Sequence, residues 1–407
     1  LSTLPPMQVR RLGLDGCGMA SLDGVEALNA DHLSLVDNPL SDLTPLTGIP
    51  VGWAPTDLVI AGTEVSDLSP LAVFSENEWR IDASRTGVSD LSQLLLFTGG
   101  IDVDLSENGI VDVSVLADPG LRATRITLRD NAIAALPDMA GVVLDAEWLD
   151  LSGNQITSLA PLAGARLRGK IDLSRNALTT LDGLDEVIFQ EIDLYLADNA
   201  LVDVSALAGL GGRIRELDLA GNKIRYVPGA PPHSIRRLDL SDNPTPAVGA
   251  MPGLERLTCR RCGLPGLGSL VPALESVGVL EISENPLASL TALEGVNLYR
   301  LEVNAVGDVV AAAAAQGLFD ELSELEAREN GLVELPPFFK VGNADLRDNG
   351  IRDLSALDFH VSGELLLGGN PIDLDLSLPA LYRVCVTDRY TVSWDEGRCA
   401  PPDYGGS

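Results

Sequence analysis

The chain has 407 residues, of which 45% are hydrophobic, so it has enough apolar side chains to bury a large core. Its 59 acidic and 28 basic residues give a net charge of −31, which argues against nucleic acid and anionic membrane surfaces as partners and favours cationic ones. No run of about 18 apolar residues occurs, so the sequence predicts no membrane-spanning segment.

One phrase recurs along the chain, for example LDLSGNQITSLAPL from Leu149 to Leu162 and IDLSRNALTTLDGL from Ile171 to Leu184. Its template is L-x-L-x-x-N-x-L-x-x-L, in which Thr or Cys can replace the Asn. The L-x-L triplet alternates as a short strand does, and we expect the N-position side chain to turn inward and bond neighbouring backbone. No copy can bury its own leucines, so stacked copies form one solenoid. The N positions are Cys17, Asn38, Thr63, Thr86, Asn108, Asn131, Asn154, Asn176, Asn199, Asn222, Asn243, Cys262, Asn285, Val306, Asn330, Asn349 and Asn370.

These positions define 17 copies, and the 353 residues between Cys17 and Asn370 span 16 intervals, a mean period of about 22 residues. Val306 has no polar side chain, so we expect its copy to be irregular. The stretch VVAAAAAQGLFDELSEL, from Val309 to Leu325, is rich in strong helix formers and predicts a helix on the outer side of that copy.

Both ends of the chain depart from the template. LSTLPPMQVRRLGL (Leu1 to Leu14) is similar to the internal LVELPPFFKVGNADL (Leu332 to Leu346), which indicates that the solenoid begins part-way through a repeat. The segment from Tyr382 to Cys399 lacks the N position and predicts a capping structure. We therefore expect a solenoid over residues 1–381 and a C-terminal cap over residues 382–407.

Five cysteines are present. Cys385 and Cys399 lie off the repeat pattern and predict a disulfide that closes the end of the structure. Cys259 and Cys262 form a C-x-x-C, which is compatible with a redox pair. Both positions point inward in the repeat, however, and we expect buried free thiols. No second C-x-x-C or neighbouring His supports a zinc site.

The repeat resembles the leucine-rich repeat family, over roughly Leu4 to Leu381. Phrases such as SDLTPL (Ser41 to Leu46) and TSLAPL (Thr157 to Leu162), with the short period, are similar to bacterial internalin-like and SDS22-like proteins. The resemblance implies an α/β repeat solenoid: a right-handed horseshoe with a parallel β-sheet on its concave face and 3₁₀ turns on its convex side. No sorting signal, wall-binding module or immunoglobulin-like domain is recognisable, so the sequence does not support attachment to a cell wall.

Two columns of charge follow the outward strand positions, which line the predicted concave face. The acidic column has three possible explanations: solvation of the strands, a docking strip for a cationic protein segment, and a Ca²⁺ ladder. No compact calcium-binding loop is present in the sequence. Bases of the second column, one residue before each triplet, offset the repulsion between neighbouring acids. The acidic column, at the x of L-x-L, is Asp82, Asp104, Asp150, Asp172, Asp218, Asp239, Glu281, Glu302, Glu326 and Asp345. The basic column is Arg11, Arg80, Arg125, Lys170, Arg237, Arg256 and Arg300.

Two aromatic residues, Trp148 and Tyr195, fall on predicted concave positions two copies apart. With Arg125, Arg129 and Lys170 they form a candidate hot spot, because Trp, Tyr and Arg dominate protein–protein binding energies. A chance placement of two aromatics explains the pattern as well. The candidate partner-binding set includes these five residues and the neighbouring carboxylates Asp104, Asp150, Asp172, Asp218 and Asp239.

Nothing in the sequence indicates catalysis. His32, His233 and His360 lie too far apart in a solenoid to meet, and no nucleophile elbow, phosphate loop or metal-binding His pair occurs. We predict a non-enzymatic protein-binding scaffold without a cofactor, extracellular or on a bacterial surface. A self-assembling adhesive protein and a Ca²⁺-dependent surface protein are the alternatives.

Overall fold

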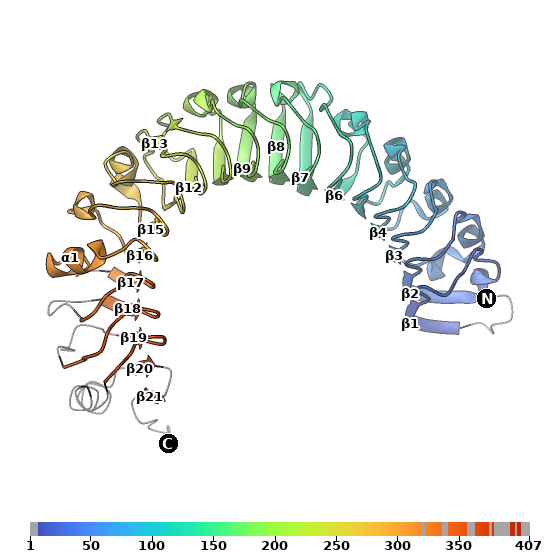
Figure 1. Cartoon of the computed structure of the whole chain (residues 1–407). Coiled ribbons are helices and arrows are strands. Elements are labelled where there is room, and N and C mark those ends of the chain that lie inside the picture. Colours follow the sequence, from blue (N-terminus) through green and yellow to red (C-terminus); the bar gives the residue numbers. More distant parts are fainter. Residues whose placement is uncertain are drawn as a thin grey trace, which may run out of the picture. The chain divides into compact units, whose positions relative to one another are not determined.

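The computed structural model describes residues 7–319, 322–335, 341–355, 363–373, 377, 391–394 and 397–399. They belong to two compact units, unit 1 (Leu1–Leu217) and unit 2 (Asp218–Ser407), and Figure 1 colours the chain along its sequence. Within both units, short parallel strands alternate with turns or short helices, which confirms the predicted repeat solenoid.

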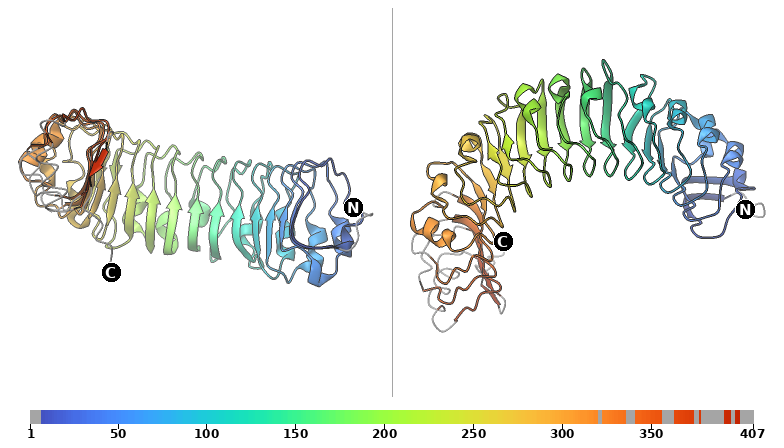
Figure 2. Two further views of the ribbon diagram at one scale, coloured as in Figure 1. Left: turned by 90° about the horizontal axis from the view of Figure 1, so that it is seen from below. Right: turned by 45° about the horizontal axis from the view of Figure 1, so that its top comes forward.

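The strands of unit 1 pair in parallel and in sequence order, from β1–β2 to β8–β9. Figure 2 shows them side by side in blue to green, with the 3₁₀ helices on the side away from the sheet. The strands are β1 (Met7–Gly13), β2 (Leu28–Ser34), β3 (Asp57–Val59), β4 (Trp79–Asp82), β5 (Ile101–Asp104), β6 (Ala123–Thr127), β7 (Val143–Asp150), β8 (Arg166–Asp172), β9 (Ile188–Tyr195) and β10 (Arg213–Asp218). The 3₁₀ helices are η1 (Val25–Ala27), η2 (Thr44–Gly48), η3 (Val51–Trp53), η4 (Ser69–Phe74), η5 (Leu91–Leu96), η6 (Ser114–Ala117), η7 (Ala160–Leu162), η8 (Leu184–Glu186) and η9 (Ser205–Gly209).

Unit 2 follows the same plan, with parallel pairing from β12–β14 to β19–β20 and an antiparallel pair β20–β21 at its end. Its strands are β11 (Tyr226–Val227), β12 (Ile235–Asp239), β13 (Ala247–Val248), β14 (Arg256–Thr258), β15 (Val279–Glu281), β16 (Arg300–Glu302), β17 (Leu322–Glu326), β18 (Val341–Asp345), β19 (Glu364–Leu366), β20 (Thr391–Trp394) and β21 (Gly397–Cys399). Its helices are η10 (Val271–Ser276), η11 (Thr291–Leu293) and α1 (Val309–Ala315).

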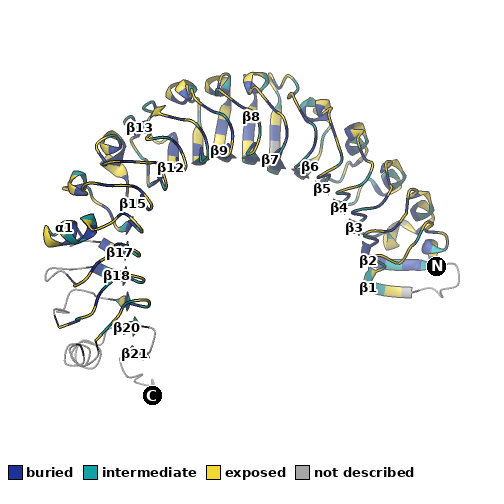
Figure 3. Cartoon of the chain, viewed as in Figure 1, coloured by how far each residue is buried: buried dark blue, intermediate teal, exposed yellow. Residues whose placement is uncertain are grey.

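The core of each unit lies between the sheet and the turns behind it. In β5, Ile101 and Val103 are buried, whereas Asp102 and Asp104 between and after them remain partly open to solvent (Figure 3). This alternation recurs from strand to strand. Each buried leucine-sized side chain contributes about 1.5–3 kcal/mol, so the stacked copies stabilise one another.

Buried asparagines join each copy to the next, as the template predicts. Asn131, for example, donates from Nδ2 to the carbonyl oxygens of Leu128 (2.9 Å) and Leu105 (3.0 Å), and its Oδ1 accepts the N–H of Ile110 (2.9 Å). Where Thr63 takes the position, its hydroxyl keeps only the local bond, to the carbonyl of Ile60 (2.7 Å). The side-chain amide therefore bonds the backbone groups that a tight turn leaves without a backbone partner.

The residue before each N position has a left-handed backbone, a feature that the template does not show. In some copies it is glycine, such as Gly153 (φ 69°), but in others it is a charged residue, such as Asp130 (φ 55°). For a residue with a Cβ this conformation costs roughly 1–2 kcal/mol. The hydrogen bonds of the adjacent asparagine offset that cost.

Aspartates of the recurring S-D-L phrase start the turns behind the sheet. Asp42 accepts the N–H of Thr44 (2.7 Å), and Asp90 accepts that of Ser92 (2.9 Å). Hydrogen bonding to Thr44 lowers the pKa of Asp42, and hydrogen bonding to Ser92 lowers that of Asp90. These carboxylates replace the missing partners of a helix N-terminus, which explains why the phrase recurs.

The helix predicted from the alanine-rich stretch is present but short. Helix α1 covers only Val309–Ala315, and Leu322–Glu326 forms strand β17 instead of continuing the helix. The helix propensity of the alanines determines the conformation of the first two turns. The L-x-L triplet at Leu325 then follows the strand period of the neighbouring copies, with which it pairs.

Candidate functional site

The predicted acidic column in unit 1 is hydrogen-bonded to its own backbone. Each of Asp82, Asp104, Asp150 and Asp172 ends a strand, and its Oδ1 accepts the N–H of the residue two positions later, at 3.0, 2.9, 2.9 and 2.8 Å. Burial, reinforced by the nearby charge of Asp150, raises the pKa of Asp172, although hydrogen bonding to Ser174 opposes the shift. These aspartates therefore close the turns after their strands, and only part of each carboxylate is open to a partner.

The acidic column of unit 2 begins in the same way and then changes. Asp218 and Asp239 accept the N–H groups of Ala220 (2.9 Å) and Ser241 (2.8 Å). Later carboxylates are bridged by arginines from the same copy or a neighbouring one. The bridges join Arg260 to Glu281 and Glu302 (2.9 and 2.8 Å), Arg300 to Glu324 and Glu326 (2.8 Å each), and Arg328 and Arg347 to Asp345 (2.7 Å each).

These bridges neutralise much of the unit 2 column within the protein. Hydrogen bonds and charge from Arg347 and Arg328 lower the pKa of Asp345, even though burial acts in the opposite direction. The repeat pattern pointed to Arg300 but not to Arg260, Arg328 and Arg347. All three directly follow a triplet, and that position could have revealed them.

Trp148, Lys170 and Tyr195 form one cluster on the solvent face of the unit 1 sheet. Trp148 and Lys170 are paired neighbours in β7 and β8, and the Lys170 ammonium lies 5.4 Å from the centroid of the Trp148 ring. The rings of Trp148 and Tyr195 lie 6.4 Å apart, at an interplanar angle of 33°. All three side chains are half-buried. We name this group the aromatic cluster.

The two arginines predicted with the cluster lie in different places. Arg125 pairs with Trp148 across β6 and β7, and its guanidinium lies 3.6 Å from Glu147, so it borders the aromatic cluster. Arg129 lies on the turn after β6, with its Nε 3.6 Å from Asp130. The structure therefore joins Arg125 to the cluster and places Arg129 at the edge of the sheet.

A buried ion pair next to the aromatic cluster was not predicted. Asp193 is the strand partner of Lys170, and its carboxylate is almost fully buried. It accepts hydrogen bonds from Nε of Arg215 (2.8 Å) and from the same guanidinium's NH2. This hydrogen bonding raises the pKa of Arg215. The pair anchors the strand that carries Tyr195.

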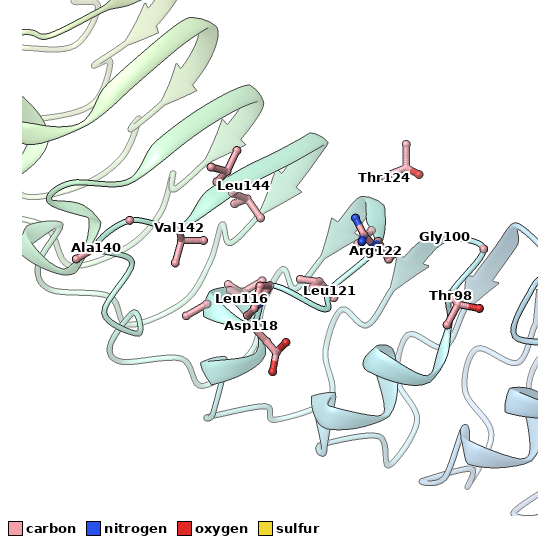
Figure 4. A pocket seen from close by; sticks show the side chains of 16 residues that line it. Thr98, Gly100, Leu116, Asp118, Leu121, Arg122, Thr124, Ala140, Val142 and Leu144 are labelled. Carbon is pink, nitrogen blue, oxygen red and sulfur yellow. The ribbon is translucent and has the colours of Figure 1, made fainter.

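A cleft of about 740 Å³ opens at the amino ends of β5, β6 and β7. Figure 4 shows its lining, which includes the apolar Leu116, Leu121, Val142 and Leu144. The described residues 132–142 contain no helix, so η6 has no helical neighbour in the next copy. The cleft occupies the place where that helix would pack.

Comparison with known proteins agrees with this architecture. No family model matches the chain. It is 26% identical to Tsukushi of Gallus gallus over 229 residues, which are 52% of this chain and 56% of that protein, so the match spans about half of the curated relative. A leucine-rich-repeat protein of Leptospira interrogans has a TM-score of 0.56 at 16% identity and covers 96% of both chains. The APL1 leucine-rich repeat domain has a TM-score of 0.51 at 19% identity, covering 77% of this chain and 85% of that one.

The chain therefore has the leucine-rich-repeat fold. Its internalin-like phrases remain a resemblance in sequence. One related structure is the LRIM1/APL1C complex, with a TM-score of 0.50 at 18% identity, covering 82% of this chain and 66% of that one.

The prediction of free thiols at Cys259 and Cys262 is wrong. Both residues are buried as expected, but they form a disulfide with their Cα atoms 5.7 Å apart. They occupy the last triplet position and the N position of one copy of this leucine-rich-repeat protein, and its tight turn brings those positions together. Cys17 is a free thiol, and it is exposed. Cys385 lies outside the described residues, so its pairing with Cys399 stays a prediction.

Two further findings concern the described residues alone. None of their His, Cys, Asp and Glu side chains form a group of three or more that could hold a metal ion. None of their helices is both long and apolar enough to cross a bilayer.

Proposed function

We propose that this leucine-rich-repeat protein is a non-enzymatic scaffold that binds another protein on the solvent face of β6–β9 in unit 1. The observation that carries the proposal is the aromatic cluster: Trp148 and Tyr195 stack on a rigid sheet beside Lys170. Aromatic side chains concentrate binding energy at interfaces. A preformed sheet loses little conformational entropy on binding, which favours affinity.

We further propose an extracellular or cell-surface location, on a bacterium. A disulfide at Cys259 and Cys262 supports the first part, because disulfides persist in oxidising compartments. The similarity of the repeat phrases to internalin-like sequences supports the second part.

Crosslinking capture from the surface and secreted fractions of the source organism tests the scaffold proposal. The intact protein is compared with Trp148→Ala/Tyr195→Ala and with Tyr226→Ala/Tyr299→Ala as a control. The control tyrosines are 61% and 56% exposed and lie outside the aromatic cluster. Circular dichroism first confirms that all three proteins are folded.

The proposal expects a foreign protein captured by the intact protein and the control but lost from the Trp148/Tyr195 variant. A partner retained equally by all three proteins contradicts the assignment of this surface. Capture of only the protein's own copies contradicts a receptor role and favours the self-assembly alternative.

A further inference from the structure

The unit 1 sheet is wider at β7, β8 and β9 than at β3–β6, the four strands directly before them. These strands have 8, 7 and 8 residues, whereas β3–β6 have three to five. The added residues pair at the amino ends, where Val143, Arg166 and Ile188 form one row across the three strands. The register shifts between this added part and the ordinary triplet.

Gly169 accommodates that shift in β8. Its φ is +85°, and a Cβ there would lie 2.0 Å from the carbonyl oxygen of Ala146. A side chain at this position is therefore excluded, and the bulge keeps both Arg168 and Lys170 on the solvent side of the sheet.

The added row exposes apolar side chains. Val143 is 66% and Ile188 41% exposed, on either side of Arg166. In the adjacent row, Leu144, Leu167 and Phe189 face inward and are buried. The exposed pair is therefore a solvent-facing surface of the sheet and no part of the core.

Strand β8 also carries a concentration of positive charge. Arg166, Arg168 and Lys170 all lie on its solvent side, in a chain whose net charge is −31. Neither Arg166 nor Lys170 forms an ion pair with a side chain that the structure describes. Arg122, also exposed, adds a fourth positive charge at the rim of the cleft.

The cleft continues this surface. Val143 is one of its lining residues, next to Val142 and Leu144. Behind it, Leu116 and Leu144 also border a small apolar cavity of about 20 Å³. The cleft therefore offers a recess with an apolar part, formed by Leu116, Leu121 and Val142, and with Asp118 also in its lining, at one end of a basic strip. We name Arg122, Val143, Arg166, Arg168 and Ile188, together with the cleft, the basic–apolar strip.

We propose that the basic–apolar strip binds an extended acidic segment of the partner protein, which carries both carboxylates and apolar side chains on the face that meets the sheet. Carboxylates of that segment pair with Arg166 and Arg122. Its apolar side chains lie on Val143 and Ile188, and one enters the cleft. This inference rests on the proposed function and reverses the charge that the sequence suggested for the partner.

Charge complementarity favours this occupant over a cationic one. The acidic column has backbone or arginine partners, whereas Arg166 and Lys170 have no acidic partner among the described side chains. A sulfated glycan would also meet the positive charges, but it would leave the exposed aliphatic pair and the apolar recess unused. Arg166 and Lys170 are four residues apart, about 13 Å along a strand, so an extended segment of roughly five residues spans the basic side.

Selection from a random dodecapeptide display library tests the inference. Peptides are selected on the intact protein and then sorted by their binding to Arg166→Glu and to Arg352→Glu. Arg352 is exposed and belongs to unit 2, so it provides a control with the same change of charge. Fluorescence anisotropy then measures the affinity of individual peptides.

We expect peptides that contain both acidic and apolar residues, with binding weakened about tenfold or more by Arg166→Glu and unchanged by Arg352→Glu. Basic peptides, a failure to select any peptide, or equal effects of the two substitutions would overturn the inference. If a heparin fragment competes for the strip more strongly than any acidic peptide, the strip would be assigned to a glycan. If capture of the partner depends on Trp148 and Tyr195 but not on Arg166, the scaffold function stands and only this inference fails.

Discussion

Replacement of Asn131 by alanine tests how strongly the asparagines hold neighbouring copies together. The Asn131 side chain is 8% exposed and makes five hydrogen bonds to backbone groups of two copies. Alanine leaves at least two of these groups, the carbonyl of Leu105 and the N–H of Ile110, buried without a partner, whereas the carbonyl of Leu128 still accepts from Asn154. At roughly 1–3 kcal/mol for each unsatisfied group, reduced by water that enters the vacated space, we expect a loss of about 2–4 kcal/mol.

Urea unfolding followed by circular dichroism measures this loss as a shift of the midpoint. Asn131→Thr is the matched variant, because Thr63 keeps the local bond at the equivalent position of another copy. We expect the threonine variant to lose about half as much as the alanine variant. A loss below about 1 kcal/mol for Asn131→Ala, or equal losses for both variants, would refute the role assigned to the amide.

Three further predictions use the same unfolding assay. Arg215→Ala leaves a buried carboxylate unpaired and should cost about 2 kcal/mol, whereas Arg213→Ala removes an exposed pair and should cost less than about 0.5 kcal/mol; equal losses would be inconsistent with the burial. The pKa of Asp345 is lower in the folded protein than the unfolded value near 3.9, so its ionised carboxylate stabilises the fold above that pH. This stabilisation is lost as the pH falls through the folded pKa. The unfolding midpoints of Asp345→Asn and the intact protein should therefore differ at pH 7 and converge near pH 2. Reduction of the described disulfide, which closes a four-residue loop, should lower stability by about 2 kcal/mol, and an unchanged midpoint in reductant would contradict this.

Much of the fold could be predicted from sequence because the determining interactions repeat. Each triplet buries its own two apolar residues against the neighbouring copies, and an Asn at the N position bonds backbone of its own copy and of the preceding one. Periodicity therefore reports both the strands and the inward asparagines. The helix at Val309 was also predictable, because alanine propensity acts locally.

The candidate site was less predictable because it depends on contacts between copies and on backbone shifts. The ion pair of Asp193 with Arg215 joins strands 22 residues apart and has no repeated signature. The widened strands depend on a bulge for which the one local sign is Gly169. The basic side of β8 was visible only in part, since Lys170 was identified and Arg166 and Arg168 were not.

Hydroxyl-radical footprinting of the protein with its captured partner tests the central claim most directly. Mass spectrometry compares side-chain labelling in the free and bound protein. We predict that labelling of Trp148 and Tyr195 falls several-fold in the complex while that of the exposed Tyr226 and Tyr299 stays constant. Protection of Tyr226 or Tyr299, with Trp148 and Tyr195 labelled as in the free protein, would contradict the claim that the partner binds the β6–β9 face of unit 1.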